Sequence, residues 1–185
     1  MYNGTKRRVF ISHYKGDRVE VDNFIEKFAT NEGVFTPFVL GANDNDDFIE
    51  STNPEYVMGQ IREKYLEDTT VTIVLIGKCT HSRRYVDWEI KSSLRQGSYT
   101  PNGLIGILLP SQGNSAHFPP RFKENWNKEH SCCYARCYIY PQNANILGEW
   151  IEDAFKARTT RSQYIKNSQD MMKYNSRCVE CGATH

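Results

Sequence analysis

The stretch TTVTIVLIG, residues 69–77, is an almost unbroken run of β-branched residues. Such a run is typical of a central parallel strand that is covered on both faces, because a strand with one exposed face alternates apolar and polar residues. Parallel neighbours need crossover connections, and these are usually helices. The stretch therefore predicts an α/β fold built around a buried parallel sheet.

The segments on either side continue the alternation of strands and helices. Short apolar runs predict further strands at residues 9–13, 34–40, 104–110 and 134–141. Helical spacing and cap signals predict helices at residues 17–31, 54–67, 82–97 and 143–158. Right-handed crossovers then give a doubly wound domain with a roughly five-stranded parallel sheet. We assign residues 1–160 to this domain and the polar residues 161–185 to a tail or small appended element.

Local signals predict where several of these elements begin or lie. Asp17 followed by Glu20 has the spacing of a capping box, and Asn53 before a proline predicts an N-cap. Ser82 is predicted to cap the helix that follows it. Pro37 places its strand towards the edge of the sheet, because proline cannot donate a hydrogen bond to a neighbouring strand.

The composition narrows the classes of partner. The 185 residues include 23 basic and 22 acidic ones, which gives a formal net charge of +1, and no basic tract stands out. Nucleic acid is therefore not an expected partner. The N-terminal stretch MYNGTKRRVFISH passes from charged residues into an apolar run that is too short for a signal peptide or a membrane span. We expect a cytoplasmic protein with no membrane partner.

The six cysteines are expected to be thiols or metal ligands rather than disulfides, because no secretion signal is predicted. Two pairs are close in sequence, Cys133 with Cys137 and Cys178 with Cys181. A zinc site with four thiolate ligands would need both pairs to converge, and Cys137 lies in a predicted strand. The default expectation is thiols with no bound metal, and this zinc site is the alternative.

The candidate ligand site follows from the predicted fold. In an open parallel sheet, ligands gather outside the carboxyl ends of the strands, at the point where the strand order reverses. The segments that leave those ends are residues 12–14, residues 41–47, residues 78–84 and the residues from 110 onward.

The stretch HSRRYVDWEIKSSL, residues 81–94, carries a glutamate between a tryptophan and an isoleucine. Val86, Ile90 and Leu94 form a stripe that is expected to face the sheet. Glu89 lies about 60° from Val86 by helical rotation, at the edge of the buried face. A carboxylate there is placed to meet developing positive charge in a partly dry site. The spacing alone leaves open a second role, that of an ordinary solvated glutamate.

Three stretches resemble, in this order, the Toll/interleukin-1 receptor (TIR) family, and within it the TIR-like proteins of the bacterial Thoeris antiphage defence system. They are RRVFISH (residues 7–13), TVTIVLIG (70–77) and CTHSRRYVDWEIKSSLRQG (79–97), with an acidic loop after the second predicted strand. The resemblance covers roughly residues 6–110 and is most specific in RRYVDWEI.

This resemblance implies a flavodoxin-like, three-layer domain that cleaves the nicotinamide–ribose bond of NAD, which is then a substrate and not a cofactor. It further implies an ADP-ribose-derived signal, either a cyclic ADP-ribose isomer or ADP-ribose joined to an amino acid. The signal would activate a separate effector protein, with a phage-derived trigger or self-assembly as the switch.

The resemblance carries the family's catalytic glutamate onto Glu89. Departure of neutral nicotinamide leaves oxocarbenium character on the ribose, and a nearby carboxylate can stabilise that charge and bind the ribose hydroxyls. Nicotinamide leaves without protonation, so a second carboxylate is not needed. The incoming nucleophile can be water, an adenine nitrogen, a ribose hydroxyl or another small molecule, and it sets the product.

The resemblance also predicts substrate contacts at the end of the first strand and around the start of the helix. Phe10 or Ile11 would form the floor of the pocket, and Ser12 and His13 would contact ribose or phosphate. A structural histidine is the alternative for His13. The predicted substrate-binding residues are Phe10, Ser12, His13, Tyr14, Arg83, Arg84 and Trp88.

Other roles are open for several of these residues. Arg83 and Arg84 can hold the pyrophosphate or can simply solvate the start of the helix. Trp88 can stack on the substrate or pack in the core. The acidic residues 43–47 resemble in position the loop that gates TIR pockets. They lack the glycine of a calcium-binding loop, so a solvated turn is expected there.

Two other classes of function are alternatives to the enzyme. A catalytically silent TIR module would recognise protein partners through its surface loops, and a glutamate in the matching position favours the enzyme over it. A phosphoacceptor or nucleotide-binding domain is disfavoured for a different reason. The first strand ends in ISHYKGD, residues 11–17, rather than in paired acidic residues or a glycine-rich phosphate loop.

Overall fold

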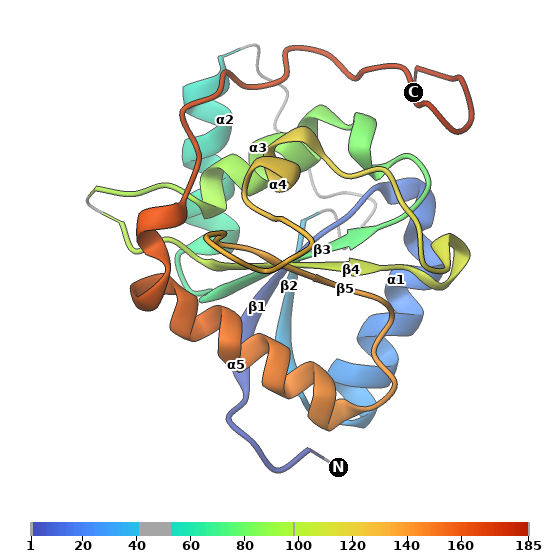
Figure 1. The fold of residues 1–185 in the computed structure, drawn as a ribbon, viewed down its shortest axis with the longest axis vertical. Helices are drawn as coiled ribbons and strands as arrows, with labels where there is room; N and C mark the ends of the chain where they lie inside the picture. Colours follow the sequence, from blue (N-terminus) through green and yellow to red (C-terminus); the bar gives the residue numbers. More distant parts are fainter. Residues whose placement is uncertain (1, 41–52, 98, 185) are drawn as a thin grey trace.

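Five parallel strands form one sheet in the order β2-β1-β3-β4-β5 (Figure 1). The computed structural model describes residues 2–40, 53–97 and 99–184. Its strands are β1 (Arg7–Ser12), β2 (Phe35–Val39), β3 (Val71–Ile76), β4 (Gly103–Leu108) and β5 (Arg136–Tyr138). This strand order is the flavodoxin-like one, so the predicted fold class is confirmed. The acidic residues 43–47 lie outside the described residues.

The central strand is β3, as TTVTIVLIG predicts. All of its residues are buried, and it pairs with β1 on one side and with β4 on the other. The register places Ile73 opposite Ile11 and Ile105. β2 lies at the edge of the sheet and carries Pro37, which confirms the edge position predicted from the proline.

Helices cover both faces of the sheet. They are α1 (Arg18–Ile25), α2 (Pro54–Ile61), α3 (Arg84–Ser93), α4 (Pro120–Glu124) and α5 (Ala144–Thr160). π-Helical turns extend α1 through Glu26–Asn31 and α2 through Arg62–Leu66. Short 3₁₀ turns lie at Lys15–Asp17, Thr80–Ser82, Pro110–Gln112 and Ser162–Tyr164.

The helices form two layers, with α1 and α5 on one face of the sheet and α2, α3 and α4 on the other (Figure 1). Side chains alternate along β1. Val9 and Ile11 therefore join the core under α1 and α5, whereas Phe10 joins the apolar cluster under α2 and α3. Ser12, two residues after Phe10, points to the same face and meets Glu89 of α3. The alternation of one strand thus aims two predicted site residues at the predicted catalytic helix.

The cap predictions had different outcomes. Asn53 caps α2, because its Oδ1 accepts hydrogen bonds from two backbone N–H groups of the first turn. The capping box at Asp17 and Glu20 is wrong. Asp17 makes no side-chain cap bond, and Glu20 accepts hydrogen bonds from the backbone and the hydroxyl of Ser111 instead. A partner distant in sequence has taken the place of the local one.

The chain after α5 passes along the layer that contains α2, α3 and α4 (Figure 1). Apart from the 3₁₀ turn at Ser162–Tyr164 this C-terminal segment, residues 161–184, contains no helix or strand in its described part. Its polar groups bond to α3 and α4, for example through Asn167 to the carbonyl of Lys91 and through the carbonyl of Gln169 to Arg121. Of the described helices, none has the length and apolar character needed to cross a membrane.

Candidate active site

Glu89 lies inside the protein, on α3 at the carboxyl edge of the sheet. Val86, Ile90 and Leu94 form the predicted buried stripe, and Glu89 beside them has only 4% of its surface exposed. Its Oε2 accepts a hydrogen bond of 2.5 Å from the hydroxyl of Ser12, the last residue of β1. A solvated surface glutamate does not describe this residue.

Burial sets the protonation of Glu89. Loss of hydration raises the pKa of Glu89 from 4.5 to about 8, and the hydrogen bond from Ser12 offsets part of the rise. The carboxyl group therefore holds a proton at neutral pH in this state of the protein. A pKa this close to neutrality is common for groups that exchange protons or charge during a reaction.

This shift makes the stability of the protein depend on pH. The folded state keeps a proton between pH 4.5 and about 8 that the unfolded state has lost. Stability present at low pH is therefore lost as the pH rises through this window, by up to about 1.4 kcal/mol per pH unit. In urea unfolding across this window, wild type should lose stability relative to Glu89→Gln as the pH rises. The same pH dependence in both proteins would contradict this prediction.

Trp88, next to Glu89, joins an apolar cluster on the α2 and α3 face. The cluster also contains Phe10, which is fully buried. The ring of Tyr85 meets Trp88 edge-on with 5.2 Å between the ring centres. The indole N–H of Trp88 donates a hydrogen bond of 2.8 Å to the carbonyl of Met172. Trp88 therefore packs in the core, and its stacking on the substrate stays a prediction.

Arg83 and Tyr14, both predicted to bind substrate, contact each other. The guanidinium carbon of Arg83 lies 4.2 Å from the centre of the Tyr14 ring. Its Nε donates a hydrogen bond to the carbonyl of Cys79, and the residue is 5% exposed. The cation is therefore held beside the end of β3 by a ring and a carbonyl.

Asp17 belongs to the same edge of the sheet, although the sequence pattern favours a cap there. Its Oδ2 accepts a hydrogen bond of 3.3 Å from the hydroxyl of Thr80, which itself accepts one from the backbone N–H of Gly77. Burial raises the pKa of Asp17 to about 6, and the bond from Thr80 opposes the rise. A Cβ atom at Gly77 would lie 2.2 Å from Oδ2 of Asp17, so only glycine leaves room for this carboxylate. The one signal in the sequence for the position of this carboxylate is that a glycine directly follows a buried strand.

His13 is partly buried at the exit from β1. Burial, followed by the charge of Arg18, lowers the pKa of His13 to about 4. The imidazole is therefore neutral at physiological pH. It can exchange hydrogen bonds with a ligand, but it does not supply positive charge to a phosphate.

The start of α3 is fastened by the C-terminal segment. Ser82, the predicted cap, donates its hydroxyl to the carbonyl of Cys79 instead, so that prediction is wrong. Oδ1 of Asn175 accepts a hydrogen bond of 3.0 Å from the backbone N–H of Arg84 and takes the place of the cap. The guanidinium of Arg84 reaches the carbonyl of Lys173 at 3.4 Å. Of the predicted site residues, Arg84 thus contacts the C-terminal segment, whereas Ser12 and Glu89 contact each other at the end of β1.

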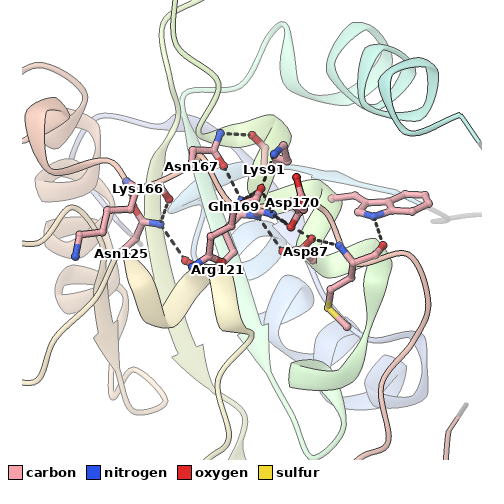
Figure 2. Close-up of polar contacts among 10 residues, drawn as sticks. Asp87, Lys91, Arg121, Asn125, Lys166, Asn167, Gln169 and Asp170 are labelled. Carbon is pink, nitrogen blue, oxygen red and sulfur yellow. Dashed lines mark hydrogen bonds and ion pairs between the residues drawn. The ribbon is translucent and has the colours of Figure 1, made fainter.

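A buried ion pair holds the same segment against α3 (Figure 2). Oδ1 of Asp87 accepts a hydrogen bond of 2.9 Å from Nε of Arg121, and their side chains are 3% and 1% exposed. The Asp87 carboxylate also accepts a bond from the backbone N–H of Met172. Arg121 donates to the carbonyls of Gln169 and Asp170. Asp87 and Arg121 therefore supply hydrogen-bond partners to backbone groups of residues 169–172, which belong to no helix or strand that would supply them.

The structure does not bring together the two cysteine pairs of the predicted zinc alternative. Cys133 lies before β5 and accepts a hydrogen bond on its sulfur from Arg136, with Cys137 within the strand. Cys178 and Cys181 lie beside Cys79 instead. In the described part of the chain, these three form a group with metal-ligand spacing.

A surface cavity of about 600 Å³ lies at the opposite, amino edge of the sheet. Its lining includes Thr69 and Asn102, which come just before β3 and β4. Ligands of doubly wound sheets bind at the carboxyl edge. We therefore place the candidate site at Glu89 and Ser12, and not at this cavity.

Residues 10–114 match the family model described as Thoeris protein ThsB, TIR-like domain. The matched range runs from β1 past β4 and includes Ser12, Arg83 and Glu89. No curated protein matches the chain. The match covers more than half of the 185 residues, and the strand order is the flavodoxin-like one that the TIR resemblance implies. The chain therefore belongs to the TIR-like domain family of the Thoeris protein ThsB.

Proposed function

We propose that this protein cleaves the nicotinamide–ribose bond of NAD and that Glu89 is the catalytic residue. The observation that supports the proposal most is the buried carboxyl group of Glu89 at the carboxyl edge of the sheet, 2.5 Å from the hydroxyl of Ser12. Membership of the Thoeris ThsB family supports a role in that defence system.

In the proposed reaction, the bond between C1′ of the ribose and the nicotinamide nitrogen breaks, and both electrons go to the nitrogen. The cationic ring leaves as neutral nicotinamide, and positive charge develops on the ribose. The ionised Glu89 stabilises that charge, and its effect is large because the site is shielded from water. A nucleophile then bonds to C1′ and gives up its proton, for which the Glu89 carboxylate is a nearby acceptor.

The reaction needs Glu89 ionised, although the substrate-free protein holds it protonated. The positive charge of the nicotinamide ring favours the carboxylate once NAD is bound, because an opposite charge nearby lowers the pKa of an acid. In the free protein the pKa of Glu89 is about 8. We therefore expect kcat/KM to rise with pH up to about 8, since this quantity reports the free enzyme.

Replacement of Ser12 by alanine should move this pH profile to higher pH. The hydrogen bond from Ser12 lowers the pKa of Glu89, so its loss leaves only the effect of burial. Initial rates of nicotinamide release between about pH 6 and pH 9 would show the shift. A profile with an unchanged midpoint would mean that the titrating group is not Glu89.

The remaining partners are part of the proposal. The ADP-ribose product, as a cyclic isomer or as a conjugate with another small molecule, would leave the site and activate a separate effector protein. A phage-derived trigger or self-assembly would switch the activity on, because a resting enzyme that drained cellular NAD would be toxic. We propose no nucleic acid or membrane partner and a cytoplasmic location.

The test is to incubate the purified protein with NAD, alone and with a filtered extract of phage-infected bacteria, and to follow free nicotinamide by liquid chromatography and mass spectrometry. The expected result is nicotinamide in equal amount to an ADP-ribose-containing product, whose mass identifies the nucleophile. Intact NAD under both conditions would overturn the proposal and favour the silent interaction module.

A further inference from the structure

Three cysteine thiols that are far apart in sequence converge at the end of β3. Cys79 follows β3 directly, and Cys178 and Cys181 come from the C-terminal segment. Their sulfur atoms all lie within 4.8 Å of one another. We propose that Cys79, Cys178 and Cys181 bind a zinc ion that fastens the C-terminal segment to the carboxyl edge of the sheet.

The spacing of the sulfur atoms fits a metal with tetrahedral coordination. Zinc–thiolate bonds are about 2.3 Å long, so two thiolates of one tetrahedron lie about 3.8 Å apart. The Sγ atoms of Cys79 and Cys181 are 3.4 Å apart, and the other pairs fall within the same 4.8 Å limit. Small side-chain movements bring all three sulfurs to the distance of a zinc site.

The backbone of the C-terminal segment is folded to present two of the ligands together. The backbone N–H of Gly182 donates to the carbonyl of Cys178 at 2.8 Å, and the N–H of Cys178 donates to the carbonyl of Ala183 at 2.8 Å. These bonds close a tight turn near the end of the chain (Figure 1). Gly182 has a φ of 74°, which glycine adopts without a steric clash because it has no Cβ atom. The C-x-x-C sequence thus has the compact turn that lets both sulfurs meet one metal ion.

The rest of the segment anchors this turn beside Cys79. The backbone N–H of Val179 donates to Nε2 of His81 at 3.3 Å, and the N–H of Ser176 donates to the carbonyl of Ser82 at 3.0 Å. His81 and Ser82 belong to the 3₁₀ turn that begins one residue after Cys79. The ligands are therefore held by contacts that do not depend on the thiols themselves.

The donor set favours zinc over a disulfide. A disulfide would join only two of the three sulfurs and leave the third as a thiol. A metal ion would bind all three. Thiolates are soft ligands that suit zinc, and three of them leave a fourth position of the tetrahedron. Cys181 is exposed, so a water molecule can reach that position.

A metal ion here would stabilise the contacts that the segment makes with α3. Asn175 and Met172 lie a few residues before Cys178, and they bond to the backbone of Arg84 and to Asp87 and Trp88 of α3. Zinc would tie the end of this segment to the chain immediately before α3. Its removal should loosen the segment while leaving the sheet folded. The proposal does not depend on the catalytic role of Glu89.

The test measures bound metal in the full chain, purified without chelator from cells grown with added zinc. Elemental analysis should find about one zinc ion per chain in wild type and less than about a tenth of that in Cys79→Ser, Cys178→Ser and Cys181→Ser. The matched control is Cys132→Ser, because Cys132 is an exposed cysteine outside the group. It should keep the wild-type content. Cys181 is exposed as well, so its variant reports on the metal even if the buried variants fold poorly.

Two further readouts complete the experiment. Cobalt added to the apoprotein should give the intense absorption of a tetrahedral thiolate site, and Cys181→Ser should lose it. Chelation of zinc from wild type should speed protease cleavage within residues 166–181 several-fold, with no such change in Cys178→Ser. Zinc-free wild type, an equal zinc content in Cys178→Ser, or a purified chain lighter by the two hydrogens of a Cys79–Cys181 disulfide would overturn the proposal.

Discussion

Replacement of Glu89 by glutamine is expected to lower the rate of nicotinamide release by at least about 100-fold. Glutamine keeps the shape of the side chain and can still contact Ser12, but it carries no negative charge at any pH. The loss follows because the proposed role of Glu89 is to stabilise charge that develops only in the transition state. The effect should therefore appear in kcat as well as in kcat/KM.

The same substitution should not unfold the protein. Burial already keeps Glu89 protonated at neutral pH, so a neutral amide of the same size suits its surroundings. Glu67→Gln is the matched control, because Glu67 is an exposed glutamate directly after the helical turns that extend α2, and its variant should keep the wild-type rate. A folded Glu89→Gln protein with the wild-type rate would remove Glu89 from the mechanism.

The second large effect is expected at the ion pair beneath the C-terminal segment. Asp87→Ala should lower the free energy of unfolding by about 3–5 kcal/mol, because it leaves the buried Arg121 guanidinium without its carboxylate. The substitution also removes the acceptor for the backbone N–H of Met172. The C-terminal segment should therefore become sensitive to protease before the rest of the chain unfolds.

The control for this prediction is the pair of Arg161 with Asp153. Their atoms approach to 2.6 Å, but the Asp153 side chain is 41% exposed. Asp153→Ala should therefore cost no more than about 1 kcal/mol. Urea unfolding and limited proteolysis of both variants make the comparison. Equal losses of unfolding free energy in the two variants would mean that burial does not make the Asp87–Arg121 pair more important for stability than an exposed pair.

Much of the fold could be predicted because its signals are local. The β-branched run before Gly77 identifies the central strand, and Pro37 identifies an edge strand. The sequence does not predict the helix α4, because it has only five residues within a proline-containing insert. The caps of α1 and α3 were also mispredicted. There Ser111 and Asn175 compete with the local residues, and contacts between distant residues leave no trace in local spacing.

The candidate site could be predicted only in part. Helical rotation places Glu89 at the edge of the buried face, but its partner Ser12 is 77 residues away in sequence. The polar C-terminal segment shows no periodicity, so its bonds to Asp87 and Trp88 could not be predicted. The single Cys79 has no neighbouring cysteine in sequence, which is why a spacing rule pairs Cys178 and Cys181 with other thiols. In each case the missing information is the position of one segment against another.

The central claim is that Glu89 makes this protein an NAD-cleaving enzyme. It is tested most directly by mass spectrometry of filtered extracts from bacteria that express wild type or Glu89→Gln, each with and without phage infection. We predict free nicotinamide and a new ADP-ribose-containing species in the wild-type extract after infection, and neither above background in the infected variant. Wild-type and variant extracts that match under both conditions would contradict the claim, and the protein would then act as an interaction module.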